Sequence, residues 1–357
     1  MKKRYTRSTQ EPKMCYHKTM ETTIIKRYKL LKSLAFQRTS SDIMTPFDVA
    51  LRLVDEIPDR LFSSEVLIPG SGYGVFALAL IHRGWDPHKI TCVEIDKAFA
   101  LLSQKYVGGL GAHIVNTDFL TWQPKMQFDV IIGNPPYQMG KNSNFYVKFI
   151  ERSAELLKEG GYFSFIIPNR FTLPHTPAAK ALKDNFQLGA LKASINDQFP
   201  GIGTSIGHVT GVRRTDGHVG TTTLTLKDGT SIEYDPSKLV VPSKQPDAAG
   251  VKAWGEISKL DSYEVTRKRP ETGEYVFIRR QWRSKAGAIF LDAVVGDHPE
   301  GHVDGAYIVT DCPKSVAEHL RGPVGPAIHK LFGDQMNLWP PLWQHLPTRK
   351  AWGNRGV

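Results

Sequence analysis

Val66-Leu67-Ile68-Pro69-Gly70-Ser71-Gly72-Tyr73-Gly74 places an apolar strand directly before a glycine-rich turn. The apolar run Val75–Arg83 that follows has the length of a short helix. Glycines at such a turn permit a tight bend and let a ligand approach the backbone closely. A strand, a glycine turn and a helix in succession therefore predict the first unit of an α/β sheet.

The alternation of strands and helices continues on both sides of this stretch. A helix that begins near Pro46, with Leu51, Val54 and Ile57 at helical spacing, precedes it. Downstream, the pattern predicts strands at 91–94, 112–116, 128–133 and 162–168 and helices at 98–106 and 146–157, with Gly160-Gly161 ending the last helix. This alternation predicts a doubly wound, mostly parallel Rossmann-like sheet.

The pattern changes near residue 212, where the helix-rich alternation stops. Thr222–Leu226 and Ser231–Tyr234 alternate in polarity and flank Asp228-Gly229, which predicts a hairpin. A chain of 357 residues also exceeds what one hydrophobic core usually supports. We expect a basic arm at 1–40, the sheet domain at 41–215 and a smaller α+β domain at 216–357.

Composition excludes several classes of protein. The content of 41% hydrophobic and 23% charged residues is ordinary for a globular chain, and no apolar stretch is long enough to span a bilayer. Cys15, Cys92 and Cys312 lie far apart without a CxxC pair, which argues against a disulfide framework and against a metal site. With no apolar signal core near the N-terminus, we expect a reduced, cytoplasmic setting and no membrane contact.

The net charge of +11 is concentrated near the N-terminus. Residues 1–40 hold eleven Lys and Arg against Glu11 and Glu21, a segment charge of +9. A basic arm of this kind commonly follows a phosphate backbone. The alternative is a solvated, partly disordered tail.

The glycine spacing and two acids indicate the ligand. A dinucleotide fingerprint needs its third glycine at position 75, where the chain has Val75, and the observed G-x-G-x-G favours the S-adenosylmethionine enzymes. Glu94 and Asp118 end the next two strands, where carboxylates can accept hydrogen bonds from the ribose hydroxyls and the adenine amino group of that cofactor. A purely structural turn and N-cap acids are the alternatives.

The tetrapeptide Asn134-Pro135-Pro136-Tyr137 follows the strand at 128–133. The amino nitrogen of adenine is a poor nucleophile because its lone pair is delocalised into the ring. Two acceptors on its N–H groups, the side-chain oxygen of Asn134 and the carbonyl of Pro135, would draw it toward tetrahedral geometry. The prolines fix φ and hold these acceptors stiffly, while Tyr137 offers a ring for base stacking, worth about 1–3 kcal/mol. The alternative is a proline-rich turn that only ends a strand.

With these motifs, residues 41–215 resemble the adenine-specific amino-methyltransferases of DNA, in the class that places the cofactor region before the target-recognition domain. In that family an NPPY tetrapeptide holds the flipped base, as Asn134–Tyr137 would here. The family's Thr-Pro motif, part of the methionine pocket, is similar to Thr45-Pro46. Its late Phe-Pro element, whose ring sandwiches the base, is similar to Phe199-Pro200.

The resemblance implies a site and a reaction. Transfer of a methyl group from S-adenosylmethionine to the N6 amino group of a flipped adenine would be catalysed by Asn134, Pro135, Pro136 and Tyr137. The expected cofactor contacts are Thr45, Pro46, Pro69, Gly70, Gly72, Glu94, Ile95, Asp118, Phe119 and Asn134. The family usually carries an acid just before the glycine turn, for the methionine ammonium, and this chain departs from it with Ile68.

The second domain carries arginines with interleaved aromatics, a composition suited to phosphate contact and base readout. The expected substrate contacts are Tyr137 and Phe199 in the first domain and Arg267, Lys268, Arg279, Arg280 and Arg283 in the second. An exposed strand pair with solvated charges is the alternative. The expected partner is double-stranded DNA, with RNA possible and a cognate restriction endonuclease possible.

Three other functions use the same residues. NPPY chemistry also serves enzymes that methylate RNA and enzymes that methylate the glutamine of release factors. The large domain after residue 215, with its clustered arginines, favours a polyanion over a protein tail. A catalytically inactive nucleic-acid-binding protein is the third alternative, and Ile68 motivates it.

Overall fold

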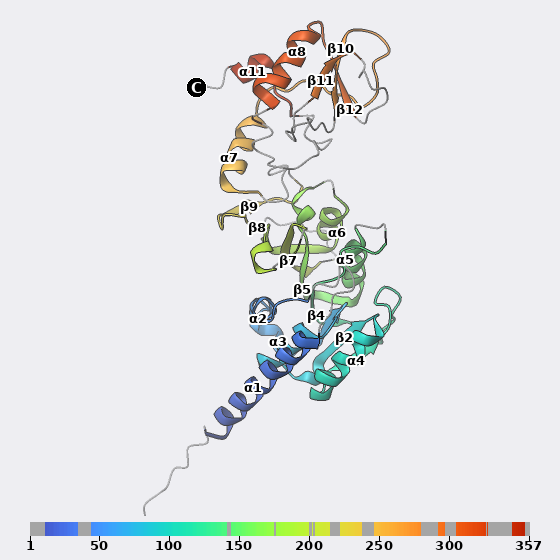
Figure 1. Ribbon diagram of the computed structural model, residues 1–357, viewed down its shortest axis with the longest axis vertical. Helices are drawn as coiled ribbons and strands as arrows, with labels where there is room; N and C mark the ends of the chain where they lie inside the picture. The colour runs from blue at the N-terminus through green and yellow to red at the C-terminus, as the bar shows by residue number, and fades with distance from the viewer. Residues whose placement is uncertain are drawn as a thin grey trace, which may run out of the picture. The chain divides into compact units, whose positions relative to one another are not determined.

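The structure is a computed structural model that describes residues 11–34, 44–140, 144–174, 176–199, 202, 204–214, 222–237, 246–279, 292–296, 305–325, 327 and 345–353. The chain divides into two compact units: Met1–Phe171 with Pro177–Leu224, and Thr172–Thr176 with Thr225–Val357. Each unit carries its own sheet (Figure 1).

The larger sheet has the order β3-β2-β1-β4-β5-β7-β6-β8-β9, with β9 at Ser231–Tyr234. β1 pairs in parallel with β2 and β4, and β7 runs antiparallel to β5 and β6, so the predicted mostly parallel sheet is confirmed. Its strands are β1 Val66–Pro69, β2 Ile90–Glu94, β3 His113–Asn116, β4 Phe128–Gly133, β5 Leu157–Pro168, β6 Phe186–Lys192, β7 Ile206–Arg213 and β8 Thr222–Thr225. Its helices are α1 Glu11–Leu34, α2 Phe47–Asp55, α3 Val75–His82, α4 Lys97–Tyr106, α5 Phe145–Leu156 and α6 Pro177–Asn185.

The parallel register brings the carboxyl ends of the strands to one edge. Pro69 at the end of β1 lies opposite Val93, and Glu94 at the end of β2 lies opposite Asn116. Ligands in sheets of this type bind at the carboxyl ends of the strands. The glycine turn, Glu94, Asp118 and Asn134 therefore leave the sheet at the same edge.

Two details of the first unit differ from the sequence pattern. α5 ends at Leu156, and Gly160 and Gly161 lie within β5 rather than ending a helix. Gly160 has φ of +74°, and a Cβ on Gly161 would lie 2.9 Å from the Lys158 carbonyl oxygen, so these glycines serve an irregular strand. The second difference is that α6 and β6 were not predicted.

The N-terminal helix α1 occupies part of the expected basic arm. It packs against α3 and α4, and the side chains of Ile24 and Leu31 are fully buried. For this helix the alternative of a solvated tail is wrong, because one of its faces belongs to the core of the first unit. Lys26, Lys29 and Lys32 are exposed.

The second unit contains the antiparallel sheet β11-β10-β12, packed against α8. Val276, Ile278 and Ile308 of this sheet are 0–1% exposed and share a core with Trp254 and Leu320. The hairpin predicted around Asp228-Gly229 is confirmed by the pairing of β8 and β9. The elements are β9 Ser231–Tyr234, α7 Ala248–Ile257, β10 Tyr275–Arg279, β11 Asp292–Val295, β12 Gly305–Val309, α8 Pro313–His319 and α11 Arg349–Gly353.

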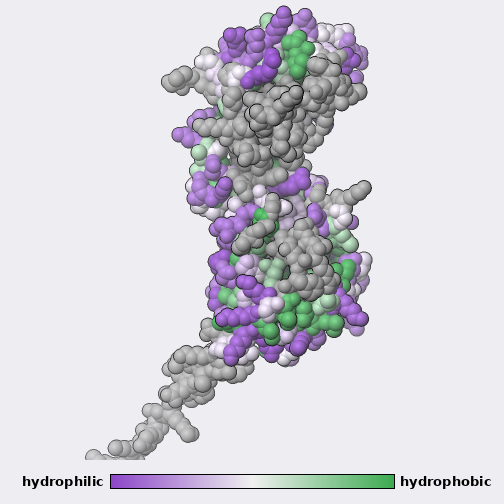
Figure 2. Space-filling view, in the orientation of Figure 1, coloured by the Kyte–Doolittle hydropathy of each residue, from purple (hydrophilic) through white to green (hydrophobic). Residues whose placement is uncertain are grey.

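Polar residues dominate the visible surface of the described parts, with a green apolar area on the first unit (Figure 2). Among the residues that the structure describes, no helix has both the length and the apolarity needed to cross a membrane.

A buried polar group joins the end of α2 to the antiparallel part of the sheet. His208 of β7 is completely buried, with Nε2 2.9 Å from the Ser164 hydroxyl of β5. Its Nδ1 lies 3.6 Å from a carboxylate oxygen of Glu56, which also pairs with Lys192. Burial, and then the positive charge of Lys192, lower the pKa of His208 from 6.5 to about 3. The imidazole is therefore neutral in the folded protein at physiological pH.

We predict that His208 makes the protein less stable in acid. Below pH 6.5 the unfolded chain binds a proton at His208 that the folded chain does not bind until about pH 3. As the pH is lowered from 6.5 to about 3, the free energy of unfolding should therefore decrease, by at most about 1.4 kcal/mol per pH unit for this one group. Urea unfolding of His208→Gln across this range should show a shallower loss than the wild type. His113→Gln, a change at an exposed histidine, is the control; equal slopes for all three proteins would contradict the assignment.

Candidate active site

The carboxamide of Asn134 is held at both of its ends. Asn134 is half-buried directly after β4, and its Nδ2 donates a hydrogen bond of 3.3 Å to the Thr45 hydroxyl oxygen. The Tyr137 hydroxyl donates a hydrogen bond of 2.8 Å to Asn134 Oδ1. Because an amide oxygen can accept two hydrogen bonds, one position on Oδ1 stays available to a ligand. Thr45, 89 positions before Asn134, therefore contacts the NPPY loop that it helps to orient.

Tyr137 is supported from behind by a second tyrosine. Its half-buried ring packs edge-on against Tyr146 at the start of α5, with ring centroids 6.5 Å apart and planes at 81°. Burial raises the pKa of Tyr137, so its hydroxyl keeps the proton that it donates to Asn134. Tyr146 is 1% exposed. This supporting role was not predicted, because the sequence pattern does not distinguish Tyr146 from any other buried residue of a helix.

The glycine turn lies against the NPPY loop. Gly70 and Gly72 have φ of +59° and +54°, the left-handed region that favours glycine. A Cβ on Gly70 would lie 3.2 Å from Pro136 Cδ, a tight contact, so both this approach and the positive φ favour glycine. A Cβ on Gly72 would meet nothing within 4 Å. The turn therefore contacts the loop at Gly70 and faces open space at Gly72.

The carboxylate of Glu94 connects the glycine turn to the end of β2. Its Oε2 accepts a hydrogen bond of 2.7 Å from the Gly72 N–H, and its Oε1 accepts one of 2.8 Å from the Asp96 N–H. Glu94 is 6% exposed, and this burial raises its pKa, while the two backbone hydrogen bonds oppose the rise. Each oxygen keeps a second acceptor position. The carboxylate thus shapes the turn and can still accept hydrogen bonds from hydroxyl groups.

The other expected cofactor residues differ in how much of each side chain is exposed. Ile95 is 60% exposed beside Glu94. Asp118 is half-buried, and its Oδ1 accepts a hydrogen bond of 2.9 Å from the Leu120 N–H, which leaves Oδ2 for a ligand. Phe119 is 3% exposed and stacks on Phe149 at 5.0 Å. A contact between Phe119 and a cofactor would therefore come from its backbone.

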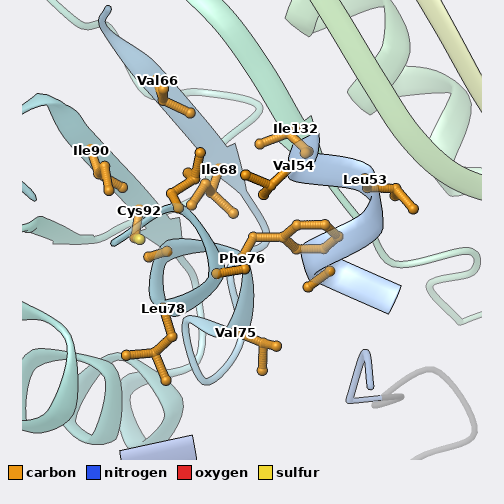
Figure 3. Packing of buried hydrophobic residues seen from close by; sticks show 14 of the residues in the cluster. Leu53, Val54, Val66, Ile68, Val75, Phe76, Leu78, Ile90, Cys92 and Ile132 are labelled. Carbon is orange, nitrogen blue, oxygen red and sulfur yellow. The ribbon is translucent and has the colours of Figure 1, made fainter. Parts of the chain in front are cut away.

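Ile68 is part of the hydrophobic core. Its side chain is 1% exposed and lies with Val54, Phe76 and Ile132 between β1, α2 and α3 (Figure 3). A carboxylate at this position would be costly without a cation beside it. The chain therefore offers no acid from position 68 to a ligand's ammonium group.

The expected substrate residues are divided between the two units. Phe199 is 3% exposed and belongs to the core cluster against which Tyr137 packs, so stacking on a base would require its ring to be uncovered. Arg267 and Lys268 are exposed in the second unit, and Lys268 lies 3.7 Å from Glu271. Arg279 ends β10. The Arg279 side chain, Arg280 and Arg283 lie outside the described residues.

Comparison with known proteins gives a consistent answer for the first unit. Residues 90–189 match the model of the Eco57I restriction-modification methylase family. The chain is similar to the tRNA1(Val) (adenine(37)-N6)-methyltransferase of Bacteroides thetaiotaomicron, with 32% identity over 121 residues, or 29% of this chain and 51% of that protein. It is also similar to the modification methylase CviBIII of Paramecium bursaria Chlorella virus NC1A, with 35% identity over 117 residues, or 29% of this chain and 30% of that protein.

The first unit is thus similar to adenine-N6 methyltransferases and to restriction-modification methylases. The chain spans about half the length, or less, of these relatives. Among solved structures, the M protein of the type I restriction enzyme EcoKI superposes with a TM-score of 0.42 at 15% identity, covering 55% of this chain and 49% of that one.

The matches support S-adenosylmethionine as the cofactor of the first unit. The residues present fit it in three respects: open space beside Gly72, a buried carboxylate at Glu94 and a free acceptor oxygen at Asp118. We propose that these groups hold the ribose and adenine. The methionine ammonium would find no carboxylate at Ile68.

We predict that Glu94→Ala raises the dissociation constant for S-adenosylmethionine by tenfold or more, about the effect of losing one hydrogen bond to a charged group. The loss has two sources: the ribose acceptor and the bond that shapes the turn at Gly72. Calorimetric titration without an acceptor measures it. Glu65→Gln, which removes the charge of a carboxylate paired with Lys89, is the control. Unchanged affinity in Glu94→Ala would remove Glu94 from the cofactor site.

Proposed function

We propose that this chain transfers the methyl group of S-adenosylmethionine to the N6 amino group of an adenine that has left the DNA helix. The observation that carries the proposal is the oriented carboxamide of Asn134, whose Nδ2 donates to Thr45 and whose Oδ1 accepts from Tyr137. The proposed catalytic residues are Asn134, Pro135, Pro136 and Tyr137.

The chemistry needs acceptors rather than a strong base. Asn134 Oδ1 and the Pro135 carbonyl oxygen would each accept one N6–H bond and localise the nitrogen lone pair. When bound, the cofactor supplies a methyl group already activated on a sulfonium. The new N–C bond forms as the C–S bond breaks, and the nitrogen then loses one proton to water. The stiff prolines keep both acceptors in place throughout.

The base must be extruded to reach these acceptors, at a cost of a few kcal/mol. Stacking on Tyr137 would offset part of this cost, and the edge contact with Tyr146 holds that ring in place. The exposed Arg267 and Lys268 of the second unit would contact the phosphate backbone. These features support a long polyanion as the substrate.

RNA is the second candidate substrate. One relative is named as a tRNA adenine methyltransferase and another as a modification methylase, so similarity supports both. We favour DNA because the chain from Thr225 onward belongs to a second compact unit, which carries the exposed Arg267 and Lys268 and is large enough for sequence readout. Radiolabelled transfer to duplex DNA, tRNA and ribosomal RNA decides the matter: methylation of RNA alone would overturn the DNA assignment. Cofactor binding without transfer to any of them would indicate an inactive nucleic-acid-binding protein.

We predict that Asn134→Ala reduces methyl transfer by at least about 100-fold, the usual effect of removing one preorganised polar group from a reaction centre. Affinity for S-adenosylmethionine should stay within about threefold of the wild type, because Glu94 and the glycine turn are unchanged. Initial rates and calorimetry measure the two effects. Asn185→Ala, which changes an asparagine that caps α6, is the matched control. Near-normal turnover in Asn134→Ala would refute the mechanism.

We also predict that the exposed face of α1 contacts phosphates. Lys26, Lys29 and Lys32 recur every three residues on this face. Replacing all three with Gln should reduce the slope of log affinity against log salt concentration by about 2–3, because each lost phosphate contact removes about 0.9 from the slope. Binding to duplex DNA at several salt concentrations measures it. The Lys180→Gln/Lys183→Gln protein serves as the control, and an unchanged slope in the triple variant excludes α1 from the interface.

A further inference from the structure

Tyr28 joins the N-terminal helix to the first turn of α2. The Phe47 N–H donates a hydrogen bond of 3.3 Å to the Tyr28 hydroxyl. The two aromatic rings stack with centroids 4.9 Å apart and planes at 25°. Tyr28 therefore contacts both the backbone and the side chain of the residue that begins α2.

The hydroxyl of Tyr28 supplies a cap that α2 lacks. The N-cap residue of α2 is Pro46, which makes no side-chain hydrogen bond to the helix. The first N–H groups of a helix have no partner within the helix, and a Ser, Thr, Asp or Asn side chain usually accepts from them. At α2, one of these N–H groups is satisfied from another helix. The start of α2 thus depends on where α1 lies.

α1 itself is fixed by burial and by a hydrogen bond to the sheet domain. Ile24 and Leu31 are fully buried, and with Tyr28 they follow the i, i+4, i+7 spacing of one helix face. The Arg27 guanidinium donates a hydrogen bond of 2.7 Å to the Tyr106 carbonyl oxygen at the end of α4. These contacts fix the position of Tyr28 on α1 relative to the sheet domain.

Phe47, which Tyr28 contacts, lies close in the chain to Thr45, the residue that orients the Asn134 carboxamide. Thr45 lies two residues before Phe47, and its hydroxyl accepts the hydrogen bond from Asn134 Nδ2. We propose that Tyr28 is a positioning residue for the reaction, which holds Thr45 so that the Asn134 carboxamide presents its oxygen to the substrate. This inference rests on the proposed function. It makes α1 part of the methyl-transfer machinery, in addition to any contact that its lysines make with phosphate.

The test is a double-mutant cycle between Tyr28→Phe and Thr45→Val. Tyr28→Phe removes the hydroxyl and keeps the stacked ring, while Thr45→Val removes the acceptor and keeps the branched shape. We expect Tyr28→Phe to lower kcat about fivefold to tenfold, the scale of one hydrogen bond, and to raise the dissociation constant for S-adenosylmethionine a few-fold. In the Thr45→Val protein the same change should have little further effect on either quantity, because the two residues act in series.

Several outcomes would overturn the inference. If Tyr28 had a purely structural role, the losses of kcat and of cofactor affinity in Tyr28→Phe would multiply with those in Thr45→Val. These losses would also correlate with a lower unfolding temperature. No loss in the single variant would exclude positioning altogether. Tyr106→Phe, which keeps the carbonyl that accepts from Arg27, is the matched control and should leave kcat unchanged. If the wild type methylates no nucleic acid, the proposed reaction is wrong. The cycle measured on the dissociation constant for S-adenosylmethionine would still decide the role of Tyr28. Absence of cofactor binding would overturn both proposals.

Discussion

A carboxamide has a donor end and an acceptor end of nearly the same shape, and only one of its two orientations presents oxygen to an amino group. In this protein the Thr45 hydroxyl accepts from the nitrogen of Asn134, and the Tyr137 hydroxyl donates to its oxygen. Thr45 comes from the segment before α2, and Tyr137 comes from the loop after β4. The position of both segments against the sheet therefore fixes the chemistry that Asn134 can perform.

The cofactor side of the site uses a buried carboxylate in a similar way. Glu94 accepts hydrogen bonds from two backbone N–H groups, those of Gly72 and Asp96. Burial raises its pKa and the backbone donors counteract the rise, so the folded chain holds a carboxylate in a largely dry position. Gly70 completes the arrangement, because its positive φ and the short distance to Pro136 both favour a residue without a Cβ.

Sequence periodicity predicted the parallel strands well because each is a short apolar run bounded by turn residues. The sequence pattern predicted the wrong structure where a residue type typical of one element occurs in another. Gly160 and Gly161 have the signature of a helix end, yet they lie in the irregular start of β5. α1 was obscured by its lysines, although Ile24, Tyr28 and Leu31 have helical spacing. The rings of Phe119 and Phe199 match family positions, but the structure buries both of them.

The sequence alone determined the α/β class, the order of the motifs along the chain and the identity of the groups at the strand ends, because these depend on local propensity and on spacing. It also showed that Ile68 is apolar where an acid is usual. Only the tertiary structure decided which groups meet. The hydrogen bonds from Asn134 to Thr45 and from Phe47 to Tyr28 join residues 89 and 19 positions apart. Contacts between such distant positions leave no periodic trace in the sequence, since they arise from how helices and strands pack rather than from the pattern within any one of them.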